Sequence, residues 1–351
     1  MTTQPSFRPG LLSVDWEQRI DYQRMRRQRL EKAQRHLAES EADALLLIAP
    51  ENVRYVTGLR SQDMPQVHFG RAACLLLSDR EPVVYTPFRE YAEEALPWLR
   101  GRVSRLSPWG MDTLEGAQAL AQDVRAWLAE LGATPGKVGV DFWTPALVKA
   151  LPEGLPGVQW VDGQGIIMQA RMIKTEDEQA CLKMAYAVTA AGMEVARQVL
   201  RPGVRECEVQ AACFATMYAL GSEWQQQSGI ITSDTYPYRR LATDKIIGYG
   251  DLVVMDVGAR VNGYMGDLTR TWVCGKGARP TKEQVRVHMQ AYRAMKRAEE
   301  AVGPGVTTRE VYRACGEENI MSALLGHGLG LGNEPPLIGP IPRETVFTLQ
   351  P

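Results

Sequence analysis

Residues 202–213 read PGVRECEVQAAC, and residues 304–315 read PGVTTREVYRAC. Aligned at an offset of 102 residues, the two segments are identical at seven of twelve positions. Each begins with a Pro-Gly turn signal and continues as an amphipathic helical pattern. Chance can produce a shared Pro-Gly-Val, but here the common register extends through the start of the helix. We therefore expect an internal duplication, with two related halves and a site between them.

The chain before this repeat alternates strand and helix signals. Short apolar runs of strand length occupy 44–49, 72–77, 82–86 and 137–142, and helical patterns occupy 15–40, 113–132 and 144–151. This alternation predicts an α/β domain whose mixed or parallel sheet is covered by helices. The Pro/Gly-rich run at 151–165 interrupts it and predicts a boundary between domains at 1–165 and 166–351. A long helix over 175–200 follows, where Thr175 and Glu178 fit a capping box.

Composition narrows the class of protein. The 351 residues suggest about two domains, and 40 basic against 41 acidic residues give no global attraction to nucleic acid or anionic membranes. No signal peptide and no apolar run of membrane-spanning length is evident, so we expect a soluble, cytoplasmic protein. Its six cysteines lack metal-site spacing and are expected to be reduced thiols. Seven basic residues over 19–35 are interpreted as a solvated helix face, with a partner or nucleic-acid patch as the alternative.

Two carboxylates lie eleven residues apart near a turn signal. Asp256 ends the apolar run LVVMDV, and Asp267 follows the sequence GARVNGYMG. A hairpin turning at Asn262-Gly263 would bring the two aspartates across from one another on adjacent strands. Facing carboxylates repel each other, and a divalent cation would relieve that repulsion. The alternative is a pair of surface aspartates beside a turn.

The histidines add one candidate ligand. There are only four, His36, His68, His288 and His327, so a zinc site with several histidine ligands is nearly excluded. His327 lies in the glycine-rich run GHGLGLG at 326–332. Glycines leave room around an imidazole for a metal or a substrate, although a lone core histidine is more often structural. The run lacks the pattern of a phosphate-binding loop.

Four segments together resemble a known family. They are NVRYVTG (52–58), RMIKTEDE (171–178), MDVGARVNGYMGDLTRT (255–271) and GHGLGLGNEPP (326–336). The first is interpreted as a strand followed by a turn. Their order and spacing resemble the creatinase, prolidase and aminopeptidase P group, the pita-bread metallopeptidases and their relatives. The resemblance implies a creatinase-type α/β domain over 1–165 and an α+β pita-bread domain over 166–351. It also implies a homodimer with a small-molecule or short-peptide substrate, and no nucleic-acid or membrane partner.

The resemblance further implies two divalent metal ions, of Mn, Fe, Co or Zn, held by five ligands. Asp256, Asp267 and His327 match the first three. The two remaining glutamates would follow Pro351, and the repeat places their equivalents near 358 and 369. We therefore expect this chain to lack the end of its second half, and to be incomplete as an enzyme by itself.

Two departures from the family pattern bear on the reaction. The peptidases have a histidine in the segment that here reads TYPYRR (235–240), and another where this chain has Glu334. In their place we predict catalytic roles for Glu334 and Tyr238. Substrate contacts are predicted for Tyr236, Arg239 and His68, the last from a neighbouring subunit. The expected activity is metal-dependent hydrolysis of a C–N bond in a small peptide-like substrate, of the Xaa-Pro peptidase type.

Two alternatives stay open. The missing histidines suit a non-peptidase reaction, such as that of the dimethylsulfoniopropionate lyases, which resemble this chain in a Thr-x-Pro-aromatic segment. However, the acidic base of those lyases is matched by Asn333, whose amide nitrogen cannot accept a proton. The other alternative is an inactive pita-bread module that binds a partner.

Overall fold

The computed structural model describes residues 20–60, 72–106, 110–224, 229–232, 241–316 and 326–338. Two compact units share the chain: Asp21–Thr175 is the N-terminal unit, and Met1–Ile20 with Glu176–Pro351 is the C-terminal unit. The N-terminal unit extends past the predicted boundary at residue 165. It does so because the helix Gln164–Met172 crosses that boundary and packs against the helix Tyr22–Ala38 of the same unit.

A six-stranded mixed sheet organises the N-terminal unit, in the order β4-β3-β2-β1-β5-β6. The strands are β1 (Ala44–Leu47), β2 (Ala73–Leu77), β3 (Arg80–Thr86), β4 (Val103–Arg105), β5 (Lys137–Val140) and β6 (Gln159–Asp162). Strand β2 runs antiparallel to both β1 and β3, whereas the β1–β5, β5–β6 and β3–β4 pairs are parallel. The predicted mixed sheet is thus confirmed, and β4 and β6 are strands that the sequence did not predict.

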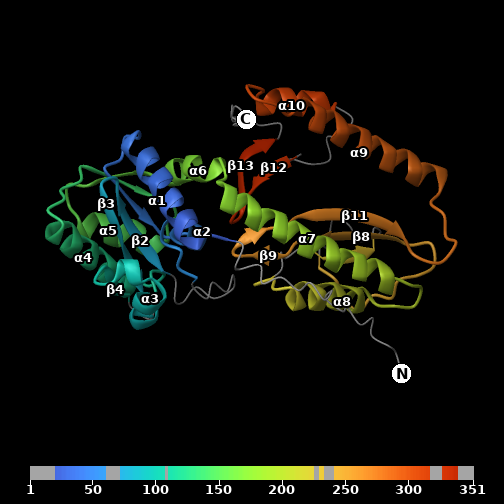
Figure 1. The fold of residues 1–351 in the computed structure, drawn as a ribbon, viewed down its shortest axis with the longest axis horizontal. Coiled ribbons are helices and arrows are strands. Elements are labelled where there is room, and N and C mark those ends of the chain that lie inside the picture. The colour runs from blue at the N-terminus through green and yellow to red at the C-terminus, as the bar shows by residue number, and fades with distance from the viewer. Residues whose placement is uncertain are drawn as a thin grey trace. The chain divides into compact units, whose positions relative to one another are not determined.

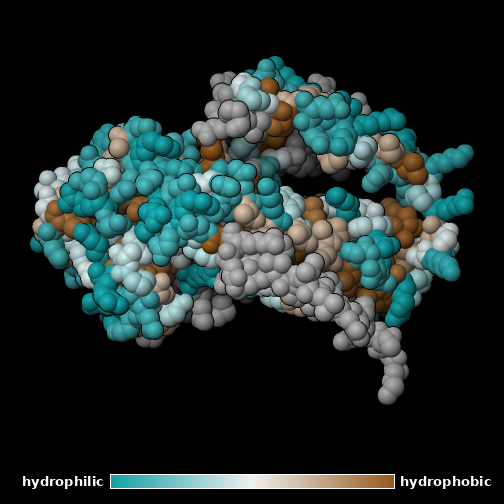
Figure 2. Space-filling view, viewed as in Figure 1, coloured by the Kyte–Doolittle hydropathy of each residue, from teal (hydrophilic) through white to brown (hydrophobic). Residues whose placement is uncertain are grey.

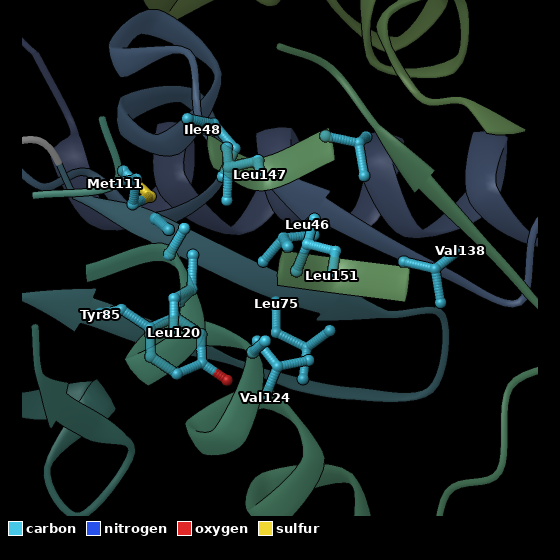
Figure 3. Close-up of a cluster of buried hydrophobic side chains, with 14 of the residues drawn as sticks. Leu46, Ile48, Leu75, Tyr85, Met111, Leu120, Val124, Val138, Leu147 and Leu151 are labelled. Carbon is cyan, nitrogen blue, oxygen red and sulfur yellow. The ribbon is translucent and has the colours of Figure 1, made fainter. Parts of the chain in front are cut away.

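Helices cover both faces of this sheet (Figure 1). They are α1 (Tyr22–Ala38), α2 (Pro50–Thr57), α3 (Arg89–Ala95), α4 (Leu114–Glu130), α5 (Pro145–Gly154) and α6 (Gln164–Met172), with a short 3₁₀ turn at Pro97–Leu99. Figure 3 shows Leu46 and Leu75 of the sheet packed with Leu120 of α4 and Leu147 of α5. Alternate strand residues such as Leu45 are also fully buried, so they face the second layer, where α1 and α2 contact the strands.

Two predicted elements differ from the structure. The helix predicted from residue 15 begins at Tyr22, because the Asp21 side chain caps it by accepting the Arg24 N–H at 2.9 Å. The segment 52–58, expected to be a strand and turn, lies in helix α2. Pro50 starts that helix, and Gly58 ends it in the left-handed conformation with φ 77°.

The C-terminal unit combines paired helices with short antiparallel hairpins. Its elements are α7 (Glu176–Val199), α8 (Glu206–Ala219), β7 (Ile230–Thr232), β8 (Leu252–Val257), β9 (Arg260–Val261), β10 (Tyr264–Met265), β11 (Leu268–Val273), α9 (Lys282–Ala301), α10 (Thr308–Cys315), β12 (Gly326–Leu329) and β13 (Asn333–Ile338). Strands β11, β8 and β7 form one sheet, and β9–β10 and β12–β13 form separate pairs. Helix α7 contacts α8, β8, β9, β10 and β11.

Both copies of the repeated segment fold in the same way. Each starts with a glycine at positive φ, Gly203 at 86° and Gly305 at 80°. In each, the third helix residue, Glu208 or Glu310, accepts the backbone N–H of the N-cap residue, Arg205 or Thr307. The second copy completes a capping box, because the Thr307 hydroxyl accepts the Glu310 N–H at 3.2 Å, whereas the arginine side chain of the first copy has no acceptor. The predicted turn and helix are therefore confirmed in both copies.

The face of the N-terminal unit turned to the viewer in Figure 2 is mostly hydrophilic, as expected when its apolar residues are buried in the core. Scattered apolar residues remain on this face. Among the described helices, none has both the length and the apolar character required to cross a bilayer.

Candidate metal centre

The β8–β11 hairpin carries both candidate aspartates. Strands β9 and β10 continue it to a tip where Val261 pairs with Tyr264. The two tip residues have positive φ, 52° at Asn262 and 81° at Gly263. Positive φ at both positions is typical of the two-residue type I′ turn, for which Asn-Gly is a preferred sequence. The predicted turn is confirmed.

The hairpin register differs in one respect from the expectation. Asp256 lies opposite Thr269, not opposite Asp267. The Thr269 hydroxyl donates a hydrogen bond to Asp256 Oδ1 at 2.9 Å. The ladder continues past Asp267, because the Gly266 N–H donates to the Ala259 carbonyl at 2.9 Å. Asp267 is two residues from Thr269, so it shares a face with Asp256 and lies diagonally from it.

Gly266, which precedes Asp267, lets the hairpin backbone pack closely against helix α7. A Cβ at Gly266 would lie 2.3 Å from Thr189 Oγ1 and 2.7 Å from the Ala185 carbonyl oxygen. The Thr189 hydroxyl donates to that same carbonyl at 2.7 Å and accepts the Ala259 N–H at 2.9 Å. The backbone beside Asp267 therefore touches the helix directly, and any side chain at Gly266 would push it away.

One aromatic side chain of α7 is electrostatically coupled to this aspartate. Burial raises the pKa of the Tyr186 hydroxyl, and the negative charge of Asp267 raises it further. The Tyr186 hydroxyl therefore stays protonated at neutral pH.

His327 faces Asp267 from the β12–β13 hairpin. Its Nε2 lies 3.6 Å from Asp267 Oδ2, and its Nδ1 lies 3.0 Å from the Gly328 carbonyl oxygen. A carbonyl can only accept a hydrogen bond, so this contact places the proton of the neutral ring on Nδ1. The Nε2 lone pair then faces a carboxylate oxygen, which is also an acceptor. A cation between the two atoms would satisfy both, and metal-ligating histidines are oriented by such a bond from the other ring nitrogen.

The donor set fits a divalent cation in part. Carboxylate oxygen and imidazole nitrogen suit Mn²⁺, Fe²⁺, Co²⁺ or Zn²⁺. The fit rests on Asp267 and His327, with Asp256 on the same hairpin face. In the part of the chain that the structure describes, no three His, Cys, Asp or Glu side chains come together as a ligand group.

The remaining predicted residues are placed differently. Glu334, at the start of β13, is 1% exposed, and its Oε1 accepts the Leu331 N–H at 3.0 Å. His68, Tyr236, Tyr238 and Arg239 lie outside the described residues. Sequence reasoning missed Gly266, Thr269 and Tyr186. Thr269 follows from the register of an Asn-Gly turn, whereas nothing in the α7 sequence distinguishes Tyr186.

Comparison with known proteins identifies the family. Residues 29–173 match the profile described as Creatinase/Prolidase N-terminal domain, and residues 180–351 match that of Metallopeptidase family M24. An Xaa-Pro dipeptidase from Pyrococcus furiosus is 27% identical over 315 residues, which cover 87% of this chain and 82% of the relative.

Solved structures agree with this match. The prolidase from Pyrococcus furiosus superposes with a TM-score of 0.70 at 26% identity, covering 90% of this chain and 88% of the other. A dipeptidase from Mycobacterium ulcerans shares the fold, with a TM-score of 0.72 at 23% identity over 93% of this chain and 86% of the other. The chain belongs to the creatinase, prolidase and aminopeptidase P group, with a creatinase-type N-terminal domain and a pita-bread domain of metallopeptidase family M24.

Proposed function

We propose that this protein is a metal-dependent hydrolase that cleaves the C–N bond of short Xaa-Pro peptides. The observation that carries the proposal is the Nε2 of His327 facing Asp267 Oδ2 at 3.6 Å, with the Nδ1 of the ring held by a backbone carbonyl. Xaa-Pro dipeptidase and prolidase relatives support the substrate class. Homodimerisation, a cytoplasmic location and manganese as the physiological ion are part of the same proposal.

Hydrogen bonds with neighbouring groups would orient the ligand side chains. Asp267 and His327, joined by Asp256, would hold the ion, which when bound would supply Lewis-acid chemistry for peptide hydrolysis. Gly328 fixes the ring tautomer of His327. The Thr269 hydroxyl donates a hydrogen bond to one oxygen of Asp256. Substrate contacts by Tyr236, Arg239 and His68, and a catalytic role for Tyr238, stay predictions.

Replacing Asp267 tests the proposal. Asp267→Ala should reduce both the affinity for Mn²⁺, measured by calorimetry, and the rate of proline release from Xaa-Pro dipeptides. We expect a loss of at least about a hundredfold, because removing a metal ligand should cost more than removing a residue that only orients a ligand. The matched control is Glu283→Ala, which removes an exposed carboxylate on α9 that pairs with Arg286. Such surface pairs contribute little, so the control should keep both properties. Undiminished proline release by Asp267→Ala would refute the assignment.

A non-peptidase reaction is the second candidate. It is favoured by the absence of both histidines of the peptidase pattern, because the segment 235–240 contains none and Glu334 occupies the second position. The same preparations, incubated with dimethylsulfoniopropionate, distinguish the two: release of a volatile sulfide without proline release would select the lyase-like reaction.

A further inference from the structure

The turn between β12 and β13 encloses the carboxylate of Glu334. The Leu331 N–H donates to Glu334 Oε1 at 3.0 Å, and the side chain is almost completely buried. A Cβ on Gly330 would lie 2.3 Å from Oε1 and 2.4 Å from Oε2 of this carboxylate. The carboxylate therefore lies directly against the backbone of Gly330, and a methyl group there could be accommodated only if the carboxylate moved.

The same turn is tied to both members of the Asp267–His327 pair. The Gly330 carbonyl accepts the Met265 N–H at 2.9 Å, two residues before Asp267. On the other side, Glu334 pairs in the ladder with Gly328, at a register shift that separates Gly328 from His327. The Gly328 carbonyl is the group that contacts His327 Nδ1. Glu334 is thus linked through short contacts to each half of the pair.

We propose that Glu334 is a positioning residue: it holds the β12–β13 turn so that Gly328 fixes the Nδ1–H tautomer of His327 and aims Nε2 at Asp267. The inference rests on the proposed function and deepens it. This role differs from the expected exchange of protons between Glu334 and the substrate. A buried carboxylate that accepts a backbone N–H stabilises the conformation of the turn that contains it.

Two substitutions separate positioning from proton transfer. Glu334→Gln keeps an oxygen that can accept the Leu331 N–H, whereas Glu334→Leu keeps a similar volume and removes the acceptor. A positioning role predicts that Glu334→Gln retains Mn²⁺ affinity and turnover within about threefold, and that Glu334→Leu loses at least about tenfold in Mn²⁺ affinity, as when a group that orients a ligand is removed. A proton-transfer role predicts instead that Glu334→Gln binds Mn²⁺ normally and loses about 100-fold or more in turnover.

The tautomer of His327 gives a readout that needs neither metal nor substrate. Long-range ¹H–¹⁵N NMR of the metal-free protein should show the Nδ1–H form of His327 in the wild type and in Glu334→Gln, and a mixture of tautomers in Glu334→Leu. Failure of the wild type to bind Mn²⁺, with this tautomer pattern intact, would refute the metal proposal and leave the positioning role standing. An unchanged tautomer and unchanged Mn²⁺ affinity in Glu334→Leu would overturn the positioning role.

Further variants guard against loss of folding. If Glu334→Leu does not fold, Gly330→Ala displaces the same carboxylate from the other side and should give the same mixture of tautomers; a wild-type tautomer there would overturn the proposal. Its matched control is Gly303→Ala, whose Cβ would meet only Val306 Cγ2, at the ordinary distance of 3.8 Å. Glu310→Leu is the control for glutamate removal, because Glu310 also accepts a backbone N–H, but in the exposed cap of α10. Both controls should keep the wild-type tautomer.

Discussion

At the scale of single residues, Asp141 shows how strongly burial acts in the N-terminal unit. Its oxygens accept the Ile48 and Ala49 N–H groups at 2.7 and 3.2 Å and the Asn52 amide at 2.7 Å. Burial nevertheless raises the pKa of Asp141 from 3.8 to about 6, since it outweighs the lowering by these hydrogen bonds. The folded state therefore keeps a proton that the unfolded chain releases.

This proton predicts a pH dependence of stability. Because the folded pKa is the higher one, the contribution of Asp141 is fully present below about pH 4 and is lost as pH rises through about 6. The free energy of unfolding of the wild type, minus that of Asp141→Asn, should fall by up to about 3 kcal/mol between pH 4 and pH 7. Urea unfolding of both proteins across this range measures the difference. A pH-independent difference would contradict the raised pKa.

At the scale of elements, the contact between α7 and the β10–β11 connection determines where Asp267 lies. Gly266→Ala would place a methyl group 2.3 Å from Thr189 Oγ1 and 2.7 Å from a helix carbonyl, and the helix backbone cannot yield. We expect a loss of about 1–3 kcal/mol in the free energy of unfolding, together with weaker Mn²⁺ binding. Denaturant unfolding and calorimetry measure the two effects. Wild-type values for both would show that the hairpin does not rest on α7.

The elements that the sequence predicted are those whose local signals agree. Short apolar runs predicted β1, β2, β3 and β5, and Asn-Gly predicted the hairpin tip. Helix α2 was mistaken for a strand because its β-branched and aromatic residues favour strands, and the signals that prevailed are Pro50 at its start and Gly58 at its end. Strand β4 has three residues and only one apolar buried position, Val103, too little for a periodic pattern.

The candidate site was predictable to the same degree. Asp256, Asp267 and His327 could be proposed from the sequence because a hairpin signal lies between the two aspartates, the histidine lies among glycines, and all three match motifs of the family that the chain resembles. The proposed positioning role of Glu334 was not predictable, because the hydrogen bond that the structure describes for it comes from a backbone N–H in a turn, and such a bond has no signature in the sequence. Tyr186 illustrates the same limit, since its coupling to Asp267 arises only when α7 packs on the hairpin.

At the scale of the molecule, the repeat organises the C-terminal unit. Its two segments form the second helix of each of two helix pairs, α7 with α8 and α9 with α10. Asp256 and Asp267 thus come from the first half and His327 from the second, as expected for a site built between duplicated halves.

The N-terminal unit, in contrast, has a core of its own. The hydrophobic cluster between the sheet and helices α4 and α5 is drawn entirely from residues 44–160. A segment that buries its own core is expected to fold alone. We therefore predict that the fragment 21–175 unfolds cooperatively in urea, with a free energy of unfolding between about 5 and 15 kcal/mol.

A core substitution makes this last prediction sharper. Leu46 is fully buried in the cluster, and Leu46→Ala should lower the free energy of unfolding of the fragment by about 2–5 kcal/mol. The control is Val148→Ala, at a position on α5 that is 58% exposed and should change it by less than about 0.5 kcal/mol. Circular dichroism in urea measures all three proteins. A fragment with no cooperative transition, or equal effects of the two substitutions, would mean that the sheet depends on residues beyond Thr175.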